Sequence, residues 1–373
     1  MKICVVTPRF AVAGVPLAQL RFAKALYKQG HSVDLVIGYV DPQYTPPVVE
    51  DIRLQVWDKP RVSSMLFDLV RYMKDEKPDI IFSAEDHLNI IVLIAAVLSF
   101  SNAKISGSSR ILPTDRMAYS NKLFSKGWVL KQFMKSVMWR ADALTCVSKD
   151  MVNYYKNIFK KSPHVSVYNI IKDAYSMNRI NENVDHDWLV NKECPVVIAA
   201  GTMTKRKGFF DLINAFSLVT QKRFVRLIIL GDGYLQDDLV SLVNKLGLSQ
   251  NVSMPGNVSN ALKYFAQSDV FVLSSYAEGM PNVLVEAMMC GCTPVSTDCP
   301  TGPRELLEGG KYGYLVPMHD PVALASGILT ALDNPIASTM LKEAVAPFEE
   351  NTVINRHFEV LGLMDQVRLG IES

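Results

Sequence analysis

The sequence predicts an α/β protein made of two doubly wound, Rossmann-like domains. Short apolar strand patterns alternate with amphipathic helix patterns, which is the order that builds a parallel sheet. The same alternation begins again after a polar stretch at 173–193, which has no sustained periodicity and is typical of an interdomain linker. The length of 373 residues also suits two domains. We therefore expect a first domain at 1–175 and a second at 190–347.

The first half opens with a βαβ unit. A strand at 2–8 is followed by a loop containing Gly14, a helix that ends near Gly30 and a second strand at 31–38. The alternation then continues to the end of this half. Further helices are expected at 61–77, 89–100 and within a basic region at 116–140, and further strands at 78–84, 103–109, 143–148 and 164–171.

The second half repeats this arrangement. Strands are expected at 194–204, 224–233, near 251–256, at 269–275 and at 293–298. Helices are expected at 209–219, up to about 246, at 260–267, at 303–308 and at 321–332. The last segment, about 348–370, has the pattern of a terminal helix, and we expect it to pack back on the first domain.

Composition indicates an ordinary globular protein, with 49% hydrophobic and 20% charged residues. The apolar run at 90–100 is too short to cross a bilayer, and the chain opens on a strand pattern rather than a signal sequence, so we expect a cytoplasmic protein. Six scattered cysteines contain no C-x2-C pair, and we interpret them as reduced packing residues.

The two halves differ in charge. Residues 1–175 contain 24 Lys and Arg against 15 Asp and Glu, a balance of +9, whereas the remainder has 15 against 22, a balance of −7. No acidic residue lies between Arg116 and Ala141. The basic residues of this stretch and the aromatic residues between them are Arg116, Lys122, Lys126, Lys131, Lys135, Arg140, Tyr119, Phe124, Trp128, Phe133 and Trp139.

Two interpretations of the stretch at 116–140 remain open. Interleaved cations and aromatic rings suit an anionic membrane surface, on which the protein would be peripheral. Alternatively, the stretch is a solvated helix whose apolar side packs on the domain. That side comprises Leu130, Phe133, Met134, Val137 and Met138. We expect no nucleic-acid partner, because no recognition motif accompanies the charge.

The segment 274–291, SSYAEGMPNVLVEAMMCG, is the most informative part of the chain. Pro281 suits the first position of a helix and Gly291 suits its end, so a short apolar helix is expected at about 281–290. Glu286 then lies inside a buried helix and needs a partner, while the N–H groups at 279–283 form an anion site. An alternative is structural: Glu278 caps the helix, and Glu286 pairs with a buried cation.

The longer segment 274–317 resembles the E-x7-E signature of glycosyltransferase family 4, the retaining transferases that use sugar nucleotides. The shared features are the flanking serine, EG-x-P, EAM-x-x-G, PV, G-x-x-E and G-x-LVP. The resemblance implies the GT-B fold, in which two domains face each other across a cleft. It also implies that Glu278 contacts the donor sugar, that Glu286 contacts the ribose, and that Gly279, Met280, Pro281, Asn282 and Val283 line the sugar and phosphate path.

The segment GTMTKRKG at 201–208 is similar to the family's G-R-L-x-x-x-K-G element, in which Arg and Lys hold the donor diphosphate. Lys207 matches the lysine. Thr202 stands where the family has arginine, which leaves Arg206 or Lys205 as the second cation. These residues follow a strand, where open α/β sheets bind ligands.

Weaker similarities complete the predicted donor site. Gly231 and Gly233 match the family's G-x-G, and Asn257 and Val258 lie in the segment that packs against the nucleotide base. In the first domain, Gly14 takes the place of the glycine-rich loop.

The first domain departs from the family after the strand at 103–109. Relatives carry a histidine there, whereas this chain has Ser109 and Arg110. His87, after another strand, is an alternative on the acceptor or catalytic side. A lone histidine is more often structural.

The resemblance therefore predicts a retaining glycosyltransferase that moves a sugar from a nucleoside-diphosphate sugar, with UDP favoured, to a glycan or lipid-linked acceptor of an envelope polysaccharide. We expect neither metal nor cofactor, because Lys207 and Arg206 supply fixed cations. Alternatives are a sugar-nucleotide epimerase or phosphorylase of the same fold, or a catalytically silent sugar-nucleotide-binding protein.

Overall fold

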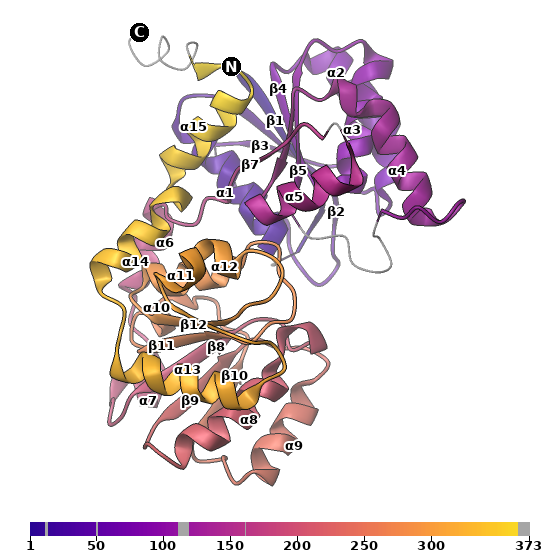
Figure 1. Ribbon diagram of the computed structural model, residues 1–373. Coiled ribbons are helices and arrows are strands. Elements are labelled where there is room, and N and C mark those ends of the chain that lie inside the picture. The colour runs from indigo at the N-terminus through magenta and orange to yellow at the C-terminus, as the bar shows by residue number, and fades with distance from the viewer. Residues whose placement is uncertain (12–13, 50, 111–118, 161, 365–373) are drawn as a thin grey trace. The chain divides into compact units, whose positions relative to one another are not determined.

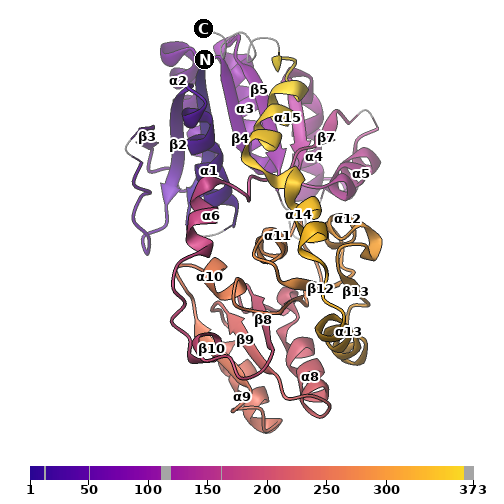
Figure 2. The same ribbon diagram turned by 90° about the vertical axis from the view of Figure 1, so that its left-hand side faces the viewer.

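The computed structural model describes residues 1–11, 14–49, 51–110, 119–160 and 162–364. The chain divides into two compact units (Figures 1 and 2). Unit 1 comprises Met1–Ile170 and Glu350–Ser373, and unit 2 comprises Ile171–Glu349. Each unit is an α/β structure built on one parallel sheet. The predicted fold class is therefore confirmed.

Unit 1 contains a seven-stranded sheet in the order β3-β2-β1-β4-β5-β6-β7. The strands are β1 Lys2–Phe10, β2 Ser32–Val40, β3 Arg53–Val56, β4 Ile80–Ala84, β5 Lys104–Ser109, β6 Ala143–Cys146 and β7 His164–Ser166. The helices are α1 Gly14–Lys28, α2 Leu66–Glu76, α3 Asp86–Ser99, α4 Lys126–Val137, α5 Lys149–Ile158 and α15 Glu350–Val360, with 3-10 turns η1 Val62–Met65 and η2 Met138–Arg140.

Unit 2 contains a six-stranded sheet in the order β10-β9-β8-β11-β12-β13. The strands are β8 Val196–Ala200, β9 Arg226–Leu230, β10 Val252–Gly256, β11 Val270–Leu273, β12 Thr293–Thr297 and β13 Tyr314–Val316. The helices are α6 Ala174–Ile180, α7 Asp187–Val190, α8 Phe209–Thr220, α9 Gln236–Lys245, α10 Leu262–Phe265, α11 Asn282–Met289, α12 Pro303–Leu306, α13 Pro321–Asp333 and α14 Ser338–Val345. The 3-10 turns are η3 Lys205–Lys207, η4 Glu308–Gly310 and η5 Ala346–Phe348.

The strand order reverses once in each sheet, between β1 and β4 in unit 1 and between β8 and β11 in unit 2. Loops that leave neighbouring strands on opposite sides of such a point diverge and leave a crevice at the carboxyl ends of the strands. In unit 2 these loops are 201–208, after β8, and 274–281, after β11. Both were predicted to bind the donor.

Two parts of the chain differ from the expected arrangement. The segment 173–193, expected to be a linker, contains α6 and α7 within unit 2. A capping box in which Asp173 and Ser176 exchange hydrogen bonds starts α6. The edge strand β3 was not expected, because two of its four residues are polar and none is buried, so its apolar signal is weak.

The C-terminal helix α15 belongs to unit 1 although it follows unit 2 in sequence. Its apolar side chains Val353, Ile354 and Phe358 join the core formed by α1 and the strands β1, β2 and β4. All six cysteines are free, and all but Cys290 are buried, in agreement with their predicted packing role.

Candidate functional site

Glu278 lies at the centre of a charged cluster in the loop that follows β11. Its side chain is only 8% exposed. Lys207 Nζ lies 2.7 Å from its Oε1, and Arg206 NH1 lies 3.3 Å from its Oε2. The hydroxyl of Ser275 donates a further hydrogen bond of 2.7 Å to Oε1. Both glutamate oxygens are thus engaged by donors, as a buried carboxylate requires.

The ionisation of Glu278 follows from this surrounding. Burial by itself raises the pKa of the carboxyl, but the charges of Lys207 and Arg206, together with the hydrogen bonds, outweigh it and hold the pKa below its ordinary value. Glu278 is therefore negatively charged at neutral pH. The site combines one buried anion with two cations, of which Arg206 is about half exposed.

Backbone contacts bind the two loops together. The Ser274 hydroxyl donates to the Lys207 carbonyl over 2.8 Å, and the Tyr276 N–H donates to the Arg206 carbonyl, also over 2.8 Å. Gly208 is needed at this contact because its φ is +64°, and a Cβ there would lie 2.0 Å from the Ser274 carbonyl oxygen. This close approach places Lys207 against Glu278.

A third loop supports the backbone after Glu278. The Thr301 hydroxyl donates to the carbonyls of Glu278 and Gly279, over 3.1 Å and 2.7 Å. A Cβ on Gly302 would lie 2.9 Å from the Gly279 carbonyl oxygen and 2.8 Å from Pro281 Cδ. Sequence reasoning did not single out Thr301, because an isolated threonine in a loop gives no signal of such a contact.

The helix after Glu278 begins one residue later than predicted. Pro281 is the N-cap with ψ of 87°, and α11 runs from Asn282 to Met289. Gly279, Met280 and Pro281, which connect Glu278 to the amino end of this helix, are buried. Asn282 and Val283 are half-buried.

Glu286 differs from its prediction. It lies in the second turn of α11 and is half-buried rather than buried. The helix packs through Leu284, Val285, Ala287 and Met288, which leaves the side of Glu286 open. The helix is apolar but not covered all round, so Glu286 is less buried than predicted.

The glycine motifs meet at the carboxyl ends of β8 and β9. Gly231 has φ of +120°, and a Cβ there would lie 2.2 Å from the Gly201 carbonyl oxygen. A Cβ on Gly233 would collide with the backbone of Met203. Both glycines therefore let the loops after β8 and β9 lie in direct contact.

The remaining predicted donor residues lie around these loops. Asn257 is exposed, and its amide donates to Asp232 over 3.4 Å. Val258 is half-buried next to it. Thr202 is exposed at the end of β8, and Arg206, not Thr202, is the residue that reaches Glu278. The backbone N–H of Lys205 contacts the Tyr234 hydroxyl.

The predicted residues of unit 1 gather at the carboxyl edge of its own sheet. Ser109, at the end of β5, donates to the carboxylate of the half-buried Asp86 over 2.5 Å. The guanidinium of Arg110 donates to Gln19 of α1 over 2.9 Å. His87 Nε2 lies 3.3 Å from Glu85. Gly14 is exposed at the start of α1.

The environment in unit 1 changes several pKa values. Burial raises the pKa of Asp86 and Glu85 and lowers the pKa of His87, although the neighbouring charge of Asp86 opposes the shift of His87. Burial also lowers the pKa of Arg110 to about 10. His87 is therefore neutral at pH 7, and Arg110 keeps its charge.

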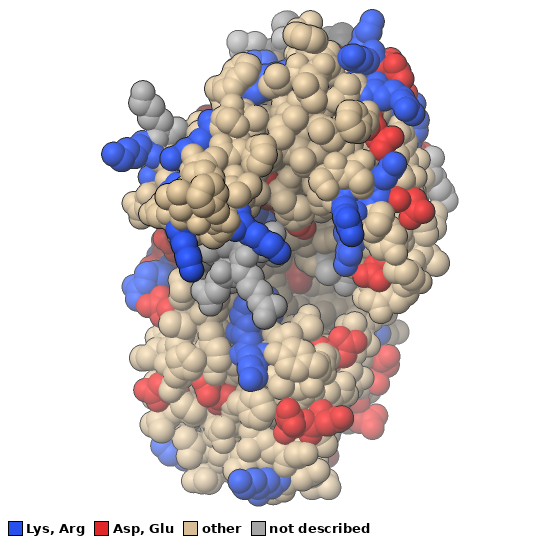
Figure 3. Space-filling model, turned by 90° about the vertical axis from the view of Figure 1, so that its right-hand side faces the viewer, with Lys and Arg blue, Asp and Glu red and all other residues tan. Residues whose placement is uncertain are grey.

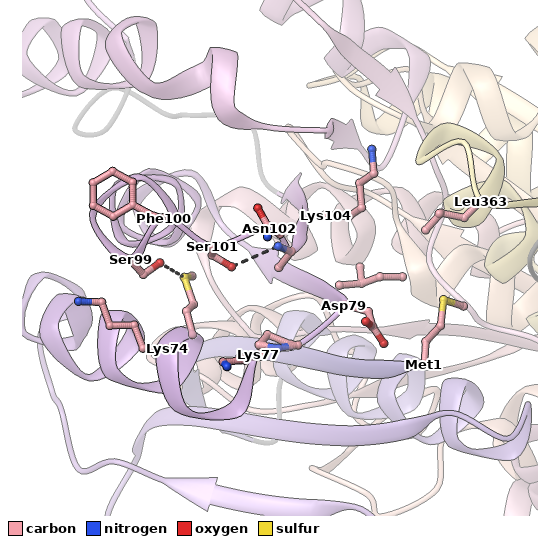
Figure 4. Close-up of a pocket in the computed structure, with 14 residues that line it drawn as sticks. Met1, Lys74, Lys77, Asp79, Ser99, Phe100, Ser101, Asn102, Lys104 and Leu363 are labelled. Atoms are coloured by element: carbon pink, nitrogen blue, oxygen red, sulfur yellow. Dashed lines mark hydrogen bonds between the residues drawn. The ribbon is translucent and has the colours of Figure 1, made fainter.

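A pocket of about 600 Å³ lies elsewhere in unit 1, at the amino ends of β4 and β5 (Figure 4). Lys74, Lys77, Asp79 and Lys104 line it. It lies at the edge of the sheet opposite to the one where open α/β sheets bind ligands. Among the described residues, no group of three or more His, Cys, Asp or Glu is arranged to hold a metal ion.

Comparison with known proteins identifies the family. Residues 13–174 match the model of Glycosyltransferase Family 4, and residues 194–334 match that of Glycosyl transferases group 1. The chain is 31% identical over 280 residues to an uncharacterized glycosyltransferase of Methanocaldococcus jannaschii, covering 68% of this chain and 67% of the relative. The chain belongs to glycosyltransferase family 4 and is a glycosyltransferase.

Other relatives are bacterial. N-acetylgalactosamine-N,N'-diacetylbacillosaminyl-diphospho-undecaprenol 4-alpha-N-acetylgalactosaminyltransferase of Campylobacter jejuni is 29% identical, over 55% of each chain. The lipopolysaccharide core biosynthesis glycosyltransferase LpsE of Rhizobium meliloti is 33% identical, over 44% of this chain and 46% of the relative. The chain thus aligns with about half the length of these two relatives.

Solved structures agree on the fold. Anabaena HepE in complex with UDP superimposes with a TM-score of 0.76 at 19% identity, covering 97% of this chain and all of that one. The lipopolysaccharide outer core galactosyltransferase WaaB gives a TM-score of 0.73 at 16% identity, covering 97% and 99%. The architecture is GT-B.

Among the described residues, no helix has the length and apolar character needed to cross a membrane.

Proposed function

We propose that this protein is a retaining glycosyltransferase that moves a sugar from a UDP-sugar to a glycan or lipid-linked acceptor during envelope polysaccharide synthesis. The observation that carries the proposal is the cluster of Lys207, Arg206 and Glu278 at the point where the strand order of unit 2 reverses. It offers cations for a diphosphate and an anion for sugar hydroxyls within one site.

The proposed reaction breaks the bond between the anomeric carbon and the diphosphate oxygen and forms a bond from that carbon to an acceptor oxygen. Negative charge grows on the departing diphosphate. Lys207, Arg206 and the positive end of α11 stabilise that charge. The acceptor hydroxyl passes its proton to an oxygen of the departing diphosphate, and no protein nucleophile is required.

Glu278 contacts the donor sugar in this proposal. Lys207 and Arg206 already hold its carboxylate in place. When a diphosphate binds, the two cations are shared between phosphate and carboxylate, and the carboxylate accepts hydrogen bonds from sugar hydroxyls. Glu286, Asn257 and Val258 serve the nucleoside part. Because fixed cations carry the diphosphate charge, we propose that the transfer needs no metal ion.

The acceptor side is assigned to unit 1. His87, Ser109 and Arg110 lie at the carboxyl edge of its sheet, and Gly14 is the first residue of α1. The name of the Campylobacter relative contains a diphospho-undecaprenol acceptor, and this supports a lipid-linked acceptor here. HepE was solved with UDP, and this supports a UDP-sugar as donor.

A donor panel tests the proposal. The protein is incubated with UDP-, GDP- and ADP-sugars, and release of the nucleoside diphosphate is measured. We expect release from a UDP-sugar and far slower release from the others. NMR of the product formed with acceptor should show the anomeric configuration of the donor.

Three outcomes would contradict parts of the proposal. Tight binding without turnover in the presence of acceptor would indicate a silent binding protein. Conversion of the sugar nucleotide to its epimer without loss of the sugar would indicate an epimerase. Inverted configuration of the product would exclude the retaining mechanism.

A further inference from the structure

Helix α4 of unit 1 carries large apolar side chains on its solvent side. Phe133 is 51% exposed, and Trp139 in the following turn η2 is 70% exposed. Phe124, just before the helix, is 80% exposed. Leu123 and Val129 are exposed as well. Burying these side chains would be favourable, so their exposure calls for an explanation.

Packing of α4 on unit 1 does not use these residues. Met134 is buried, while Leu130, Val137 and Met138 are half-buried, and α4 packs against α3. One of the two interpretations of the sequence was a helix that packs on the domain through these residues and Phe133. The structure confirms most of that set but places Phe133 on the outside. The outer stripe therefore has another role than packing the core.

Lysines lie on both flanks of this exposed side. By helical periodicity, Lys126 lies near Val129 and Phe133, whereas Lys131 and Lys135 lie on the other flank of α4. Lys122, Lys126 and Lys135 are exposed, and Lys131 is half-buried. Within the described part of the chain, none of these four lysines pairs with a carboxylate. Burial, and then the like charge of Lys135, lowers the pKa of Lys131. The cations thus act on one another without a neutralising acid.

The apolar surface continues beyond α4. Arg140 of η2 donates to the carbonyls of Ser101 and Ala103, over 2.7 Å and 2.9 Å, and so joins η2 to the segment after α3. Phe100 in that segment also lines the pocket at the amino ends of β4 and β5, and it is 89% exposed. Figure 3 shows the side of unit 1 that carries α4, where lysine and arginine side chains stand out around uncharged surface.

We propose that this aromatic–basic face binds a bilayer that contains anionic lipids. The face comprises Leu123, Phe124, Val129, Phe133, Trp139, Phe100, Lys122, Lys126, Lys131 and Lys135. Aromatic rings insert at the level of the lipid headgroups, and lysines reach the anionic phosphates around them. A protein partner would bring its own carboxylates to the four lysines, but it would not require so many separate protruding rings. Arg116 lies outside the described residues.

This inference names a partner for the proposed function, because a lipid-linked acceptor lies in such a bilayer. It rests on the proposed function only for that purpose. The membrane contact itself can be measured without donor or acceptor, so the two proposals fail independently.

Vesicle sedimentation tests the contact directly. The full chain is mixed with vesicles of phosphatidylcholine alone or of phosphatidylcholine with phosphatidylglycerol. We expect binding to the mixed vesicles only, decreasing as salt is raised. Equal binding to both kinds of vesicle, or binding unaffected by salt, would overturn the proposal.

Charge variants locate the contact. The triple variant Lys122→Gln, Lys126→Gln, Lys135→Gln should bind the mixed vesicles roughly a hundredfold more weakly, about fivefold for each lysine. The matched control replaces the exposed Lys222, Lys245 and Lys342 of unit 2 by Gln and should bind as the parent does. Equal weakening in both would show a dependence on net charge alone.

Variants of the aromatic residues distinguish insertion of the rings into the bilayer from binding by charge alone. Phe124→Ser, Phe133→Ser and Trp139→Ser combined should weaken binding roughly tenfold or more. The control replaces the similarly exposed Tyr175, Val190 and Phe224 by Ser. Unchanged binding of the first triple variant would refute insertion of the rings. Nucleoside-diphosphate release from the donor in solution should be the same in every variant, because none touches the charged cluster.

Discussion

Glu278 is the residue on which the account of the site depends. Its side chain is 8% exposed, and burial by itself raises the pKa of the carboxyl. Lys207 and Arg206 reverse that shift. The pairing also has a consequence for binding. The cations that a diphosphate needs are already neutralised in part by a protein group, so a nucleotide must compete with Glu278.

The competition leads to a prediction for Glu278→Gln. The substitution keeps the shape of the side chain and removes its charge. UDP without a sugar should then bind about tenfold more tightly, because a negative charge next to the diphosphate is gone. Sugar transfer should fall strongly at the same time. Isothermal titration with UDP measures the affinity.

The control for this prediction is Asp238→Asn, which removes an exposed negative charge from α9 of the same unit. It should leave the affinity for UDP unchanged. Weaker UDP binding by Glu278→Gln, with intact folding, would mean that the carboxylate assists the diphosphate instead of competing with it.

Several residues of the site could be predicted from the sequence. Lys207, Gly208 and Glu278 lie in motifs whose spacing places them at strand ends, and the structure brings the two charges together. Arg206 was one of two candidates to replace the missing arginine at Thr202; it contacts Glu278, and its role toward a diphosphate stays a prediction. Thr301 and Gly302 escaped prediction because their role arises from the packing of a distant loop. The prediction that Glu286 is buried was wrong, because the periodicity of a helix does not show which of its faces a neighbouring element covers.

At the level of elements, strands and helices with strong apolar patterns were predictable, and short half-exposed ones were not. The strands β1, β4, β8 and β9 are buried over most of their length, and apolar residues make up most of their sequence. The edge strand β3 has no such signal. Helix α15 illustrates a further limit: its apolar face was evident, whereas the histidine within that face was not recognised as buried.

His357 on α15 gives a pH dependence to unit 1. It is buried against the rings of Phe22 and Phe82, and burial, followed by the charge of Arg110, lowers its pKa to about 3. A histidine whose folded-state pKa is lowered binds fewer protons than in the unfolded chain. Its contribution to stability is therefore complete above pH 6.5 and is lost as the pH falls toward 3.

We expect the substitution His357→Phe to reduce this loss. Lowering the pH from 8 to 5 should reduce the free energy of unfolding by about 2 kcal/mol through the wild-type His357, and the variant should lack this reduction. Burial also lowers the pKa of His164 on β7 to about 3. His164 therefore contributes equally to the pH dependence of stability in the wild type and in the variant. Hydrogen exchange of the α15 amides at pH 8 and pH 5 measures the difference. The same pH dependence in both proteins would contradict the assignment.

For the whole molecule, the sequence predicted two parallel-sheet units and the family to which they belong. It succeeded because the βαβ alternation occurs twice and because the motifs of unit 2 lie close together in the chain. The chain passes from unit 1 to unit 2 and back again. The backbone N–H groups of Ile171 and Lys172 donate hydrogen bonds to the carbonyl of Phe348. The segment that enters unit 2 and the segment that leaves it therefore lie side by side. A contact between residues so far apart in sequence has no local signal.

The charge difference between the halves also acquires a structural meaning at this scale. In unit 2, Lys207 and Arg206 pair with the carboxylate of Glu278. In unit 1, the lysines around α4 have no carboxylate partner among the described residues. We therefore assign the donor to the former and an anionic surface to the latter. The two assignments can be tested separately.

The most direct test of the central claim is sugar transfer by the variant Lys207→Ala, compared with the exposed-lysine control Lys222→Ala. We expect Lys207→Ala to lower turnover of the UDP-sugar at least a hundredfold, because it removes a cation that stabilises the departing diphosphate, while circular dichroism shows an intact fold. The control should keep full activity. Turnover by a folded Lys207→Ala variant at the rate of the parent would contradict the account.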